Sequence, residues 1–330
     1  MNPSLRAIIT GTGMAVPKEV LGNDHFESYL DTSDEWITTR SGIKHRHRAG
    51  EGETTVSLAL EASQKAIEDA GINAEDLDLI LFATVTPDTF VPSAACWLQG
   101  ELGAKNAGAM DLNAACAGLI YGMTQAAMYL NSGMYKHILI VGAETLSRIT
   151  DPQDRATVVL FGDGASAVIM SHTDDPERGV LYQNLGADGT CADYIWLPAG
   201  GSRLPNTQAT LAEKLDKLRM KGREVYKFAV VKFNRLVQKA LKETGLKADQ
   251  IDLIIPHQSN LRIIESVQEK MKLPMDKFVV NIDRYGNTSA ASVGMALDEA
   301  RRDGRVQPGN VVMMIAFGAG LTWAVMVVRI

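Results

Sequence analysis

The chain has 330 residues, of which 46% are hydrophobic and 22% are charged, and its formal net charge is −6. This length suits one large domain or two ordinary ones, and the acidic balance argues against general nucleic-acid or anionic-membrane binding. The apolar runs are too short to span a membrane and residues 1–6 do not form a signal peptide, so we expect a cytoplasmic protein. The three cysteines, Cys96, Cys116 and Cys191, fit neither a disulfide framework nor a zinc site.

The first part of the chain alternates strand-like and helix-like segments. Residues 7–13 read as a strand that ends in a Gly-x-Gly turn, but Pro17 stands where the helix of a dinucleotide-binding loop would begin, so we reject that motif. Residues 56–70 carry apolar side chains at helical spacing, and residues 78–83 form a buried strand. Alternation of this kind predicts an α/β fold.

Charged segments mark the expected surface. Residues 32–37 have a capped start that predicts a short helix, and the loop 40–48 that follows is basic. The histidines in this loop have no acidic or thiol partners nearby, so we interpret them as solvated rather than as metal ligands. Residues 203–219 read as a surface insertion or lid. The helix 221–242 carries seven basic residues and one acidic residue, which suits a solvated face or the docking of an acidic partner.

A half-length repeat divides the chain. Three pairs of segments match in the same order, and the first pair is offset by 174 residues: 65–80 with 239–254, 122–123 with 294–295, and 165–170 with 321–326. Repeated helix–strand units at this period predict two similar α/β halves, residues 1–175 and residues 176–330.

Residues 111–122 carry the candidate nucleophile. A short apolar run ends at Asn113, small residues surround Cys116, and an apolar helical pattern follows. This order predicts a strand, a tight turn and a helix that begins at Cys116, where the helix N-terminus would lower the pKa of the thiol. A buried cysteine that acts as a small hydrophobe is the alternative, and this turn alone does not decide between the two.

Three later loops could complete a site. His257 ends a strongly apolar strand, although a core histidine with satisfied hydrogen bonds would fit the same pattern. Residues 285–291 are the repeat counterpart of the Cys116 turn, which makes Asn287 the expected mate of the nucleophile, or else an ordinary helix cap. The loop 317–320 is rich in glycine and could present a backbone N–H that forms an oxyanion hole together with the Cys116 amide.

Cysteine, histidine and asparagine together indicate nucleophilic catalysis through a thiol. Papain-like amide hydrolases use the same three residue types, but their cysteine lies near the mature N-terminus and their chains have no half-length repeat. The other chemistry is acyl transfer through a thioester, followed by carbon–carbon bond formation.

Across essentially its whole length, the chain resembles β-ketoacyl-ACP synthase III, the initiating condensing enzyme of type II fatty acid synthesis in the thiolase superfamily. Asn287 is the most telling residue, because elongating synthases carry a second histidine there. The motifs that carry the resemblance are 32–37 with 39–43, 92–96, 113–118, 154–155 before 161–164, 220–228, 257–263 and 285–289.

The resemblance implies a thiolase fold with five layers, α-β-α-β-α, an internal pseudo-twofold duplication and a homodimer. It implies that Cys116 takes an acyl group from acyl-CoA. Malonyl-ACP then loses CO2 while His257 and Asn287 stabilise the developing enolate, and the carbanion attacks the acyl group, whose oxygen lies on the Cys116 and Ala319 amides. Acyl-CoA and an acidic acyl carrier protein are the implied partners, with no cofactor, metal, nucleic acid or membrane.

The resemblance also implies two sets of binding residues. Those for CoA are Thr32, Trp36, Arg40, Arg155, Gly222 and Asn260, with the Trp36 ring stacked on adenine. Those for the carrier protein are Gln258, Ser259, Asn260, Leu261, Arg262, Lys227, Arg223 and Lys270. Charged guanidinium groups suit phosphates and aromatic faces alike. A core anchor is the alternative role for Trp36.

The chain departs from the family pattern at two positions. Ala319 stands where many relatives have glycine, so its amide serves the oxyanion hole provided that no positive φ is needed there. Val91 stands where acetyl-using relatives often place a phenylalanine at the bottom of the partner subunit's acyl pocket, which predicts primers longer than acetyl. The primer and the acceptor stay open, since a secondary-metabolism paralogue could keep all three residues, and an acyl-CoA-binding scaffold is the non-enzymatic alternative.

Overall fold

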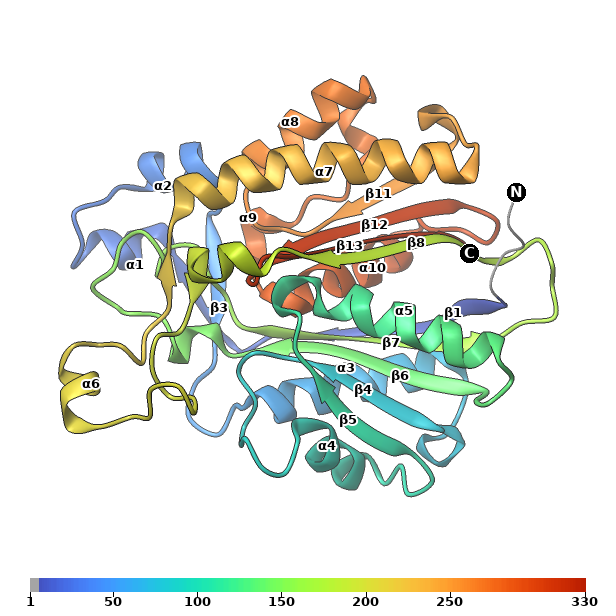
Figure 1. The fold of residues 1–330 in the computed structure, drawn as a ribbon, viewed down its shortest axis with the longest axis horizontal. Coiled ribbons are helices and arrows are strands. Elements are labelled where there is room, and N and C mark those ends of the chain that lie inside the picture. The colour runs from blue at the N-terminus through green and yellow to red at the C-terminus, as the bar shows by residue number, and fades with distance from the viewer. Residues whose placement is uncertain (1–5) are drawn as a thin grey trace.

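The computed structural model describes residues 6–330. The prediction that residues 1–6 are not a signal peptide therefore falls almost entirely outside the described residues. Two β-sheets face each other across a pair of helices, and further helices cover the outer face of each sheet (Figure 1). The five layers therefore follow the order α-β-α-β-α, which confirms the predicted architecture.

The first sheet has the strand order β1-β7-β6-β4-β5. Its strands are β1 (Ala7–Ala15), β4 (Leu79–Ala83), β5 (Gly108–Leu112), β6 (His137–Glu144) and β7 (Gly164–His172). β4 is parallel to β5 and β6, and β7 is antiparallel to β1 and β6. Because helices cover both of its faces, β4 is an uninterrupted buried apolar run. The outer helices are α3 (Thr55–Ala70) and α4 (Ala94–Leu102).

The second sheet has the order β11-β12-β13-β8. Its strands are β8 (Gly179–Ala187), β11 (Leu253–Pro256), β12 (Val311–Gly318) and β13 (Thr322–Arg329). β11 and β12 are parallel, and the other neighbours are antiparallel. Its outer helices are α7 (Gly222–Thr244) and α8 (Leu261–Met271). α7 is strongly amphipathic, and its apolar face packs on the sheet while its basic face is exposed.

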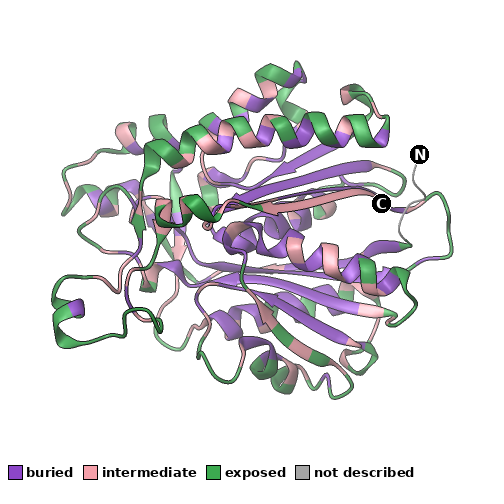
Figure 2. Ribbon diagram, in the orientation of Figure 1, coloured by how far each residue is buried: buried purple, intermediate pink, exposed green. Residues whose placement is uncertain are grey.

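The central layer consists of α5 (Gly118–Asn131) and α10 (Ser292–Arg302), which both contact the two sheets. Glycine lets both helices approach the first sheet closely. A Cβ on Gly118 would lie 2.7 Å from the Ala83 Cβ of β4, and one on Gly294 would lie 2.3 Å from the Ser166 Oγ of β7. Burial concentrates in the sheets and these two helices, whereas exposed residues lie on the outer helices and loops (Figure 2).

The two halves repeat each other in register. Leu79 pairs with Ile138 in the first sheet, and the residues 174 positions later, Leu253 and Val312, pair in the second. The turns that open the central helices agree as well, because Ala115 has φ 47° and Ser289, again 174 positions later, has φ 50°. All strands of the first sheet precede residue 175 and all strands of the second follow it, and on this basis we propose residues 1–175 and 176–330 as the two halves.

This register corrects three details of the sequence analysis. The counterpart of Asn287 is Asn113, and the counterpart of Cys116 is Ala290, so Asn287 is not the symmetry mate of the nucleophile. The other two matches lie two residues out of register: residues 296–297 correspond to 122–123, and residues 323–328 correspond to 165–170. Short matches between apolar segments tolerate such a slip because the residue types are alike.

The remaining elements surround one end of the sheets. The predicted short helix is α2 (Asp34–Ser41), capped by Ser33, and the predicted insertion forms an exposed projection around α6 (Gln208–Ala212) (Figure 1). The others are β2 (Glu19–Gly22), α1 (Asn23–Glu27), β3 (His45–Arg48), β9 (Ile195–Trp196), β10 (Arg219–Met220), α9 (Ile282–Tyr285) and the 3-10 turns η1 (Ala74–Asp76), η2 (Ala115–Ala117), η3 (Leu146–Arg148), η4 (Gly189–Tyr194), η5 (Ala248–Gln250), η6 (Met275–Lys277) and η7 (Ser289–Ala291).

Candidate active site

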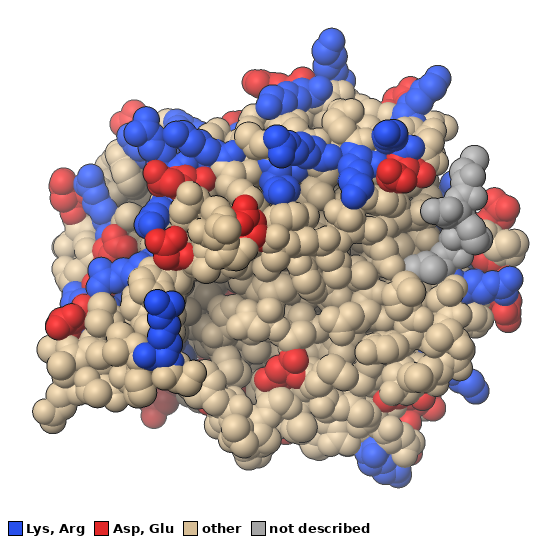
Figure 3. All heavy atoms as spheres, in the orientation of Figure 1, with Lys and Arg blue, Asp and Glu red and all other residues tan. Residues whose placement is uncertain are grey.

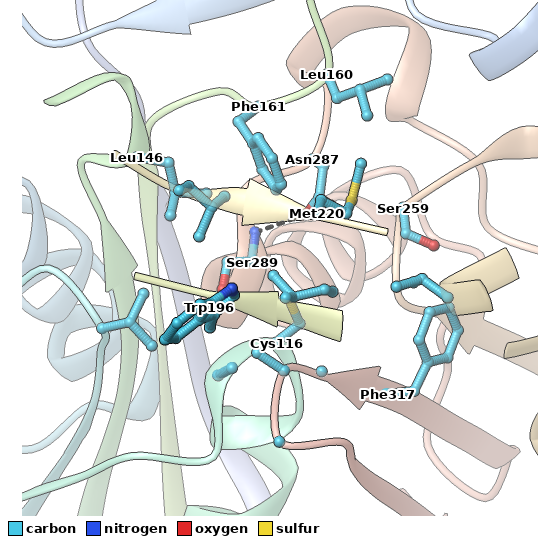
Figure 4. Close-up of a pocket in the computed structure, with 18 of the residues that line it drawn as sticks. Cys116, Leu146, Leu160, Phe161, Trp196, Met220, Ser259, Asn287, Ser289 and Phe317 are labelled. Carbon is cyan, nitrogen blue, oxygen red and sulfur yellow. Dashed lines mark hydrogen bonds between the residues drawn. The ribbon is translucent and has the colours of Figure 1, made fainter. Parts of the chain in front are cut away.

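A cavity of about 490 Å³ opens where the two sheets end, and Cys116, His257 and Asn287 all line it (Figure 4). The rest of its wall is mostly apolar, with Leu146 and Phe161 on one side and Phe317 on another. The structure thus brings together the three side chains that the sequence predicts, from η2, from the end of β11 and from the loop before η7.

The Cys116 turn is held from both sides. Ala115 adopts a left-handed conformation, its N–H donates to the Asn113 Oδ1 at 3.3 Å, and the Thr322 hydroxyl donates to the Ala114 carbonyl at 2.8 Å. The thiol is part of a one-turn 3-10 segment that leads into α5. Burial raises the pKa of Cys116 to about 12, so the expected lowering by the helix N-terminus is wrong for the substrate-free protein. The resting nucleophile is therefore a thiol that needs a proton acceptor.

Backbone of the last hairpin lies against this turn. A Cβ on Gly318 would come within 2.6 Å of the Cys116 nitrogen, so only glycine allows this approach. Ala319 lines the cavity beside it, and no positive φ is found at this alanine. Because Ala319 does not need a positive φ, an alanine can present its amide at this position, which supports the predicted oxyanion hole.

His257 is buried, with 2% of its surface exposed, and one of its nitrogens is fixed. The Ser292 Oγ lies 2.6 Å from Nδ1, and the same oxygen accepts from the Gln258 N–H at 3.3 Å. Among the described residues, His257 Nδ1 is the only acceptor within reach of the Ser292 hydroxyl proton. Nδ1 therefore accepts this hydrogen bond, and we assign the imidazole hydrogen to Nε2. Burial lowers the pKa of His257 to about 3, which keeps the ring neutral and makes it a hydrogen-bond donor rather than a base.

Asn287 is held as firmly. Its Oδ1 accepts the Ser289 N–H at 2.9 Å, which fixes the orientation of the amide and leaves Nδ2 as a donor (Figure 4). The backbone of Asn287 donates to the Leu160 carbonyl at 2.9 Å and accepts from the Gly162 N–H at 3.0 Å. Two donors, His257 Nε2 and Asn287 Nδ2, are thus available at one cavity.

The cavity mouth is basic. A second hollow, of about 440 Å³, adjoins the first, since Tyr226 and Asn260 line both. Its other lining residues are Arg40, Arg223, Lys227 and Arg262, all four of which the sequence predicts for CoA or carrier-protein binding. Lys and Arg gather along α7 and α8 above the hollow face, whereas the face below them is largely uncharged (Figure 3).

Trp36 lies half-buried beside this mouth. The guanidinium carbons of Arg40 and Arg155 stand 4.9 Å and 5.2 Å from its ring centroid, and Arg155 also bonds to Asp31. Part of the indole packs against a small core cluster, which supports the core-anchor role, and stacking on adenine stays a prediction. Gly222 lines the main cavity, whereas Thr32 is not among the lining residues of either hollow.

The predicted docking segment is only partly exposed. Gln258 is 1% exposed, and its side chain bonds to the backbone of Pro256, Val279 and Asn281, so it cannot contact a carrier protein and that expectation is corrected. A buried amide is indistinguishable from an exposed one in sequence. Three other predicted docking residues are placed as follows: Ser259 lines the main cavity, Leu261 packs in the core cluster beside Trp36, and exposed Lys270 lies in the last turn of α8, about 12 Å along the helix from Arg262.

Sequence reasoning missed three polar residues behind the reacting groups. Ser292 supports His257, and Ser289 lies between Cys116 and the carboxyl group of Glu144. Glu144 is fully buried at the end of β6. An acid that closes an otherwise apolar strand is the one signal that could have found it.

The fold and site define a class: two stacked halves that supply a cysteine turn, a histidine and an asparagine form a condensing enzyme of the thiolase fold. Family models described as 3-oxoacyl-[acyl-carrier-protein (ACP)] synthase III, and as its C-terminal part, match residues 110–189 and 241–330. A relative from Caldanaerobacter subterraneus subsp. tengcongensis, named β-ketoacyl-[acyl-carrier-protein] synthase III, is 48% identical over 329 residues and covers 100% of this chain and 99% of its own. The chain belongs to the β-ketoacyl-[acyl-carrier-protein] synthase III family, whose members are acyltransferases.

Solved structures agree with this assignment. The 3-oxoacyl-[acyl-carrier-protein] synthase III of Aquifex aeolicus VF5 superposes with a TM-score of 0.90 at 42% identity, over 98% of this chain and 100% of the other. The priming β-ketosynthase of the R1128 polyketide pathway reaches 0.90 at 32% identity, over 100% and 98%. Within residues 6–330, no three His, Cys, Asp or Glu side chains are grouped to hold a metal ion, and no helix is both long and apolar enough to cross a membrane.

Proposed function

We propose that this protein transfers an acyl group from acyl-CoA to Cys116 and condenses it with malonyl-ACP, releasing CoA, CO2 and β-ketoacyl-ACP, to initiate fatty acid synthesis in the cytoplasm. One observation carries the proposal: the thiol, His257 Nε2 and Asn287 Nδ2 face the same cavity. A thiol with two neutral donors suits a reaction in which negative charge develops on a thioester oxygen.

In the first step, the Cys116 sulfur attacks the acyl thioester carbon. The carbonyl oxygen gains charge and is stabilised by the amides of Cys116 and Ala319, which the Gly318 approach holds side by side. Collapse of this tetrahedral intermediate breaks the bond to the CoA sulfur, which takes up the proton lost by the Cys116 thiol, and acyl-Cys116 remains. The apolar wall around the thiol excludes water, which protects the acyl-enzyme from hydrolysis.

In the second step, malonyl-ACP occupies the same cavity and loses CO2. The electron pair left behind becomes an enolate whose oxygen accepts from His257 Nε2 and Asn287 Nδ2. Neutral donors suit this task, because a protonated imidazole would give up its proton to the enolate and quench the carbanion. The carbanion then attacks the acyl-Cys116 carbon, and the Cys116 thiolate leaves and takes up a proton from solvent. Because protein groups supply every donor, we propose that no cofactor takes part.

The basic mouth supports the two substrates. Arg40, Arg155 and Trp36 offer guanidinium groups and an aromatic face to the nucleotide part of CoA, and Gly222 and Asn260 lie further in. Arg223, Lys227 and Arg262 gather at the same opening, where an acidic carrier protein would present its prosthetic arm. Salt should therefore weaken carrier-protein binding more than it weakens folding.

We also propose a homodimer. β5 is an edge strand with a partly exposed Met110, and nearby Phe90 and Val91 are 85% and 87% exposed in the single chain. Large apolar side chains that point away from their own core suit a partner surface. In such a dimer Val91 would contribute to the partner subunit's acyl pocket.

The test is intact-protein mass after incubation with acyl-CoAs from acetyl to dodecanoyl, followed by malonyl-ACP. We expect a mass gain on Cys116 that malonyl-ACP removes as β-ketoacyl-ACP forms. The second candidate is a secondary-metabolism paralogue that passes the acyl group to another acceptor; the likeness to the priming β-ketosynthase of a polyketide pathway, at 32% identity, is the observation behind it. It would show a mass gain that malonyl-ACP leaves in place, and the absence of any mass gain would overturn both candidates.

A further inference from the structure

Glu144 is a buried carboxyl group that the steps above do not use. It has no exposed surface and accepts four hydrogen bonds, from the Thr86 hydroxyl at 2.7 Å, the Val85 N–H at 3.1 Å, the Ser289 hydroxyl at 3.1 Å and the Thr84 hydroxyl at 3.2 Å. Three of these donors come from the end of β4 and one from η7. These donors satisfy the hydrogen-bonding capacity of the buried carboxyl group, so its position and orientation are fixed by specific contacts.

The repeat shows that the turn does not need this side chain in order to fold. Glu144 ends β6 as Gly318, 174 positions later, ends β12. η7 packs against the end of β6, and η2 packs against the end of β12. At the second junction a Cβ would already collide with the Cys116 nitrogen, yet the turn has the same left-handed residue. The carboxyl group at the first junction is therefore an addition to a fold that closes without one.

Ser289 connects Glu144 to the nucleophile. Its backbone is fixed by the bond from its N–H to the Asn287 Oδ1, and its hydroxyl donates to Glu144 Oε1. Its side chain lines the same cavity as Cys116 and holds the pKa of that thiol lower than burial alone would set it. Figure 4 shows Ser289 and Cys116 facing the same cavity. The hydroxyl has one proton, so when it donates to Glu144 its oxygen is left to accept from the thiol.

We propose that Glu144 is a positioning residue for the first step, which turns the Ser289 hydroxyl so that its oxygen accepts the Cys116 thiol proton. This inference rests on the proposed function for the identity of the acyl donor only. As the sulfur bonds to the thioester carbon, its S–H bond breaks and the proton passes to the Ser289 oxygen. The former hydroxyl proton passes to Glu144 Oε1. When the bond to CoA breaks, the proton returns through Ser289 to the departing CoA thiolate, which leaves as a thiol.

The ionisable neighbours support this direction of transfer. Burial raises the pKa of Glu144 to about 7, which suits a group that takes up and returns a proton near neutral pH. Neutral His257 has Nδ1 occupied by Ser292 and its pKa lowered to about 3, so it is a poor acceptor for the thiol proton. The carboxylate of Asp163, before β7, accepts hydrogen bonds from Ser147 and from the Ala49 N–H, and no contact joins it to the thiol among the described residues.

The test follows alkylation of Cys116 by iodoacetamide in the full-length protein, from about pH 5 to about pH 10, with peptide mapping to separate Cys116 from the other two cysteines. Iodoacetamide needs a free thiol but no acyl-CoA site, so a failure of this test is distinct from a failure of the proposed function. We expect the wild-type rate to rise through pH 7 and then level. The rate should also fall in D2O, because a proton moves in the rate-limiting step.

Three variants separate a proton path from a structural role. Glu144→Gln keeps the shape but cannot accept a proton, and Ser289→Ala cuts the path, so both should lose the inflection, the D2O effect and roughly 10²-fold in rate at pH 8. Thr86→Val removes a donor to the carboxylate, which raises the pKa of Glu144 and should move the inflection to higher pH. If Glu144→Gln fails to fold, the shift in Thr86→Val still decides the matter.

A wild-type profile retained by Glu144→Gln, or an inflection that stays in place in Thr86→Val, would overturn the inference. The same variants are then compared in Cys116 acylation by the acyl-CoA that the wild type accepts. Loss of rate there, with an unchanged pH profile, would assign Glu144 a structural role only.

Discussion

The Ser292 Oγ, at the start of α10, lies 2.6 Å from the Nδ1 of His257, at the end of β11. This bond joins the central helix layer to the second sheet and determines which nitrogen of the imidazole carries the proton. We expect Ser292→Ala to let the ring adopt either tautomer or turn away. Malonyl-ACP decarboxylation should slow roughly tenfold, the effect of losing about 1.4 kcal/mol of transition-state stabilisation, while acyl transfer to Cys116 changes little.

Ser63→Ala is the matched control for this change. Ser63 is a fully buried serine on α3 whose hydroxyl finds no hydrogen-bond partner within residues 6–330, so its removal should leave both half-reactions unchanged. Stopped-flow release of CO2 measures decarboxylation, and intact mass measures acylation. Equal losses in both half-reactions of Ser292→Ala would contradict the assigned role.

In the proposed mechanism, Asn287 also acts in decarboxylation and not in acylation, which predicts the behaviour of Asn287→Asp. Oδ1 already accepts the Ser289 N–H, and the second oxygen of the aspartate would replace the Nδ2 donor with an acceptor facing the cavity. Decarboxylation should fall by about 10²–10³-fold, and acylation of Cys116 should persist. Asn310→Asp, at a turn where Oδ1 likewise accepts a backbone N–H, should not affect either step. Full decarboxylation in Asn287→Asp would show that the amide donor is dispensable.

Trp36 should contribute to affinity and not to chemistry. The guanidinium groups of Arg40 and Arg155 both lie over its ring, outside the main cavity. We expect Trp36→Ala to raise the KM for acyl-CoA roughly tenfold, as stacking on one base contributes about 1–3 kcal/mol, with kcat nearly unchanged. Acyl thioesters of N-acetylcysteamine, which lack the nucleotide, should react equally with both proteins, and Trp36→Phe should retain most of the affinity. A change in kcat alone would refute this role.

Site residues could be predicted from the sequence where a local pattern marks them, and could not be predicted where their role depends on distant partners. Cys116, His257 and Asn287 could be found because each stands where an apolar strand or turn meets a glycine-rich or small-residue segment, which is a local pattern. Glu144 and Ser292 could not be assigned, because their roles depend on partners 145 and 35 positions away. The pKa of the Cys116 thiol is raised and not lowered, because burial, which is a tertiary property, is the largest influence on it.

Arg46 shows the same limit. The sequence places it in an exposed basic loop, but it lies on β3 and is 1% exposed, with its guanidinium donating to the Leu21 and Val159 carbonyls and to the Asn23 Oδ1. The alternation of Arg with His in this segment gave no apolar signal, so the buried face of the strand could not be recognised. The half-length repeat, in contrast, predicted two similar α/β halves, because it depends on spacing along the whole chain.

A buried carboxyl group also has a consequence for stability. The pKa of Glu144 rises from 4.5 to about 7 on folding, so its neutral form is favoured in the folded state. Its contribution to the free energy of unfolding is therefore fully present below about pH 4.5 and is lost as pH rises through 7. Glu144→Gln cannot ionise, and we expect the variant to gain up to about 3 kcal/mol relative to the wild type between these two pH values. Urea unfolding at several pH values measures this difference, and a pH-independent difference would contradict the buried, titrating carboxyl group.

The last prediction concerns the length of the primer. Val91 is 87% exposed in the single chain and does not line its own cavity, so an effect on acyl specificity requires that it contribute to the partner subunit's cavity. Val91→Phe should shorten that pocket, lowering kcat/KM for four-carbon to eight-carbon acyl-CoAs by at least roughly tenfold while acetyl-CoA keeps its rate. Val20→Phe, at an exposed valine on β2, is the matched control and should leave the preference unchanged. A wild type that uses acetyl-CoA alone would contradict the roomier pocket, and an unchanged preference in Val91→Phe would place the end of the acyl pocket elsewhere.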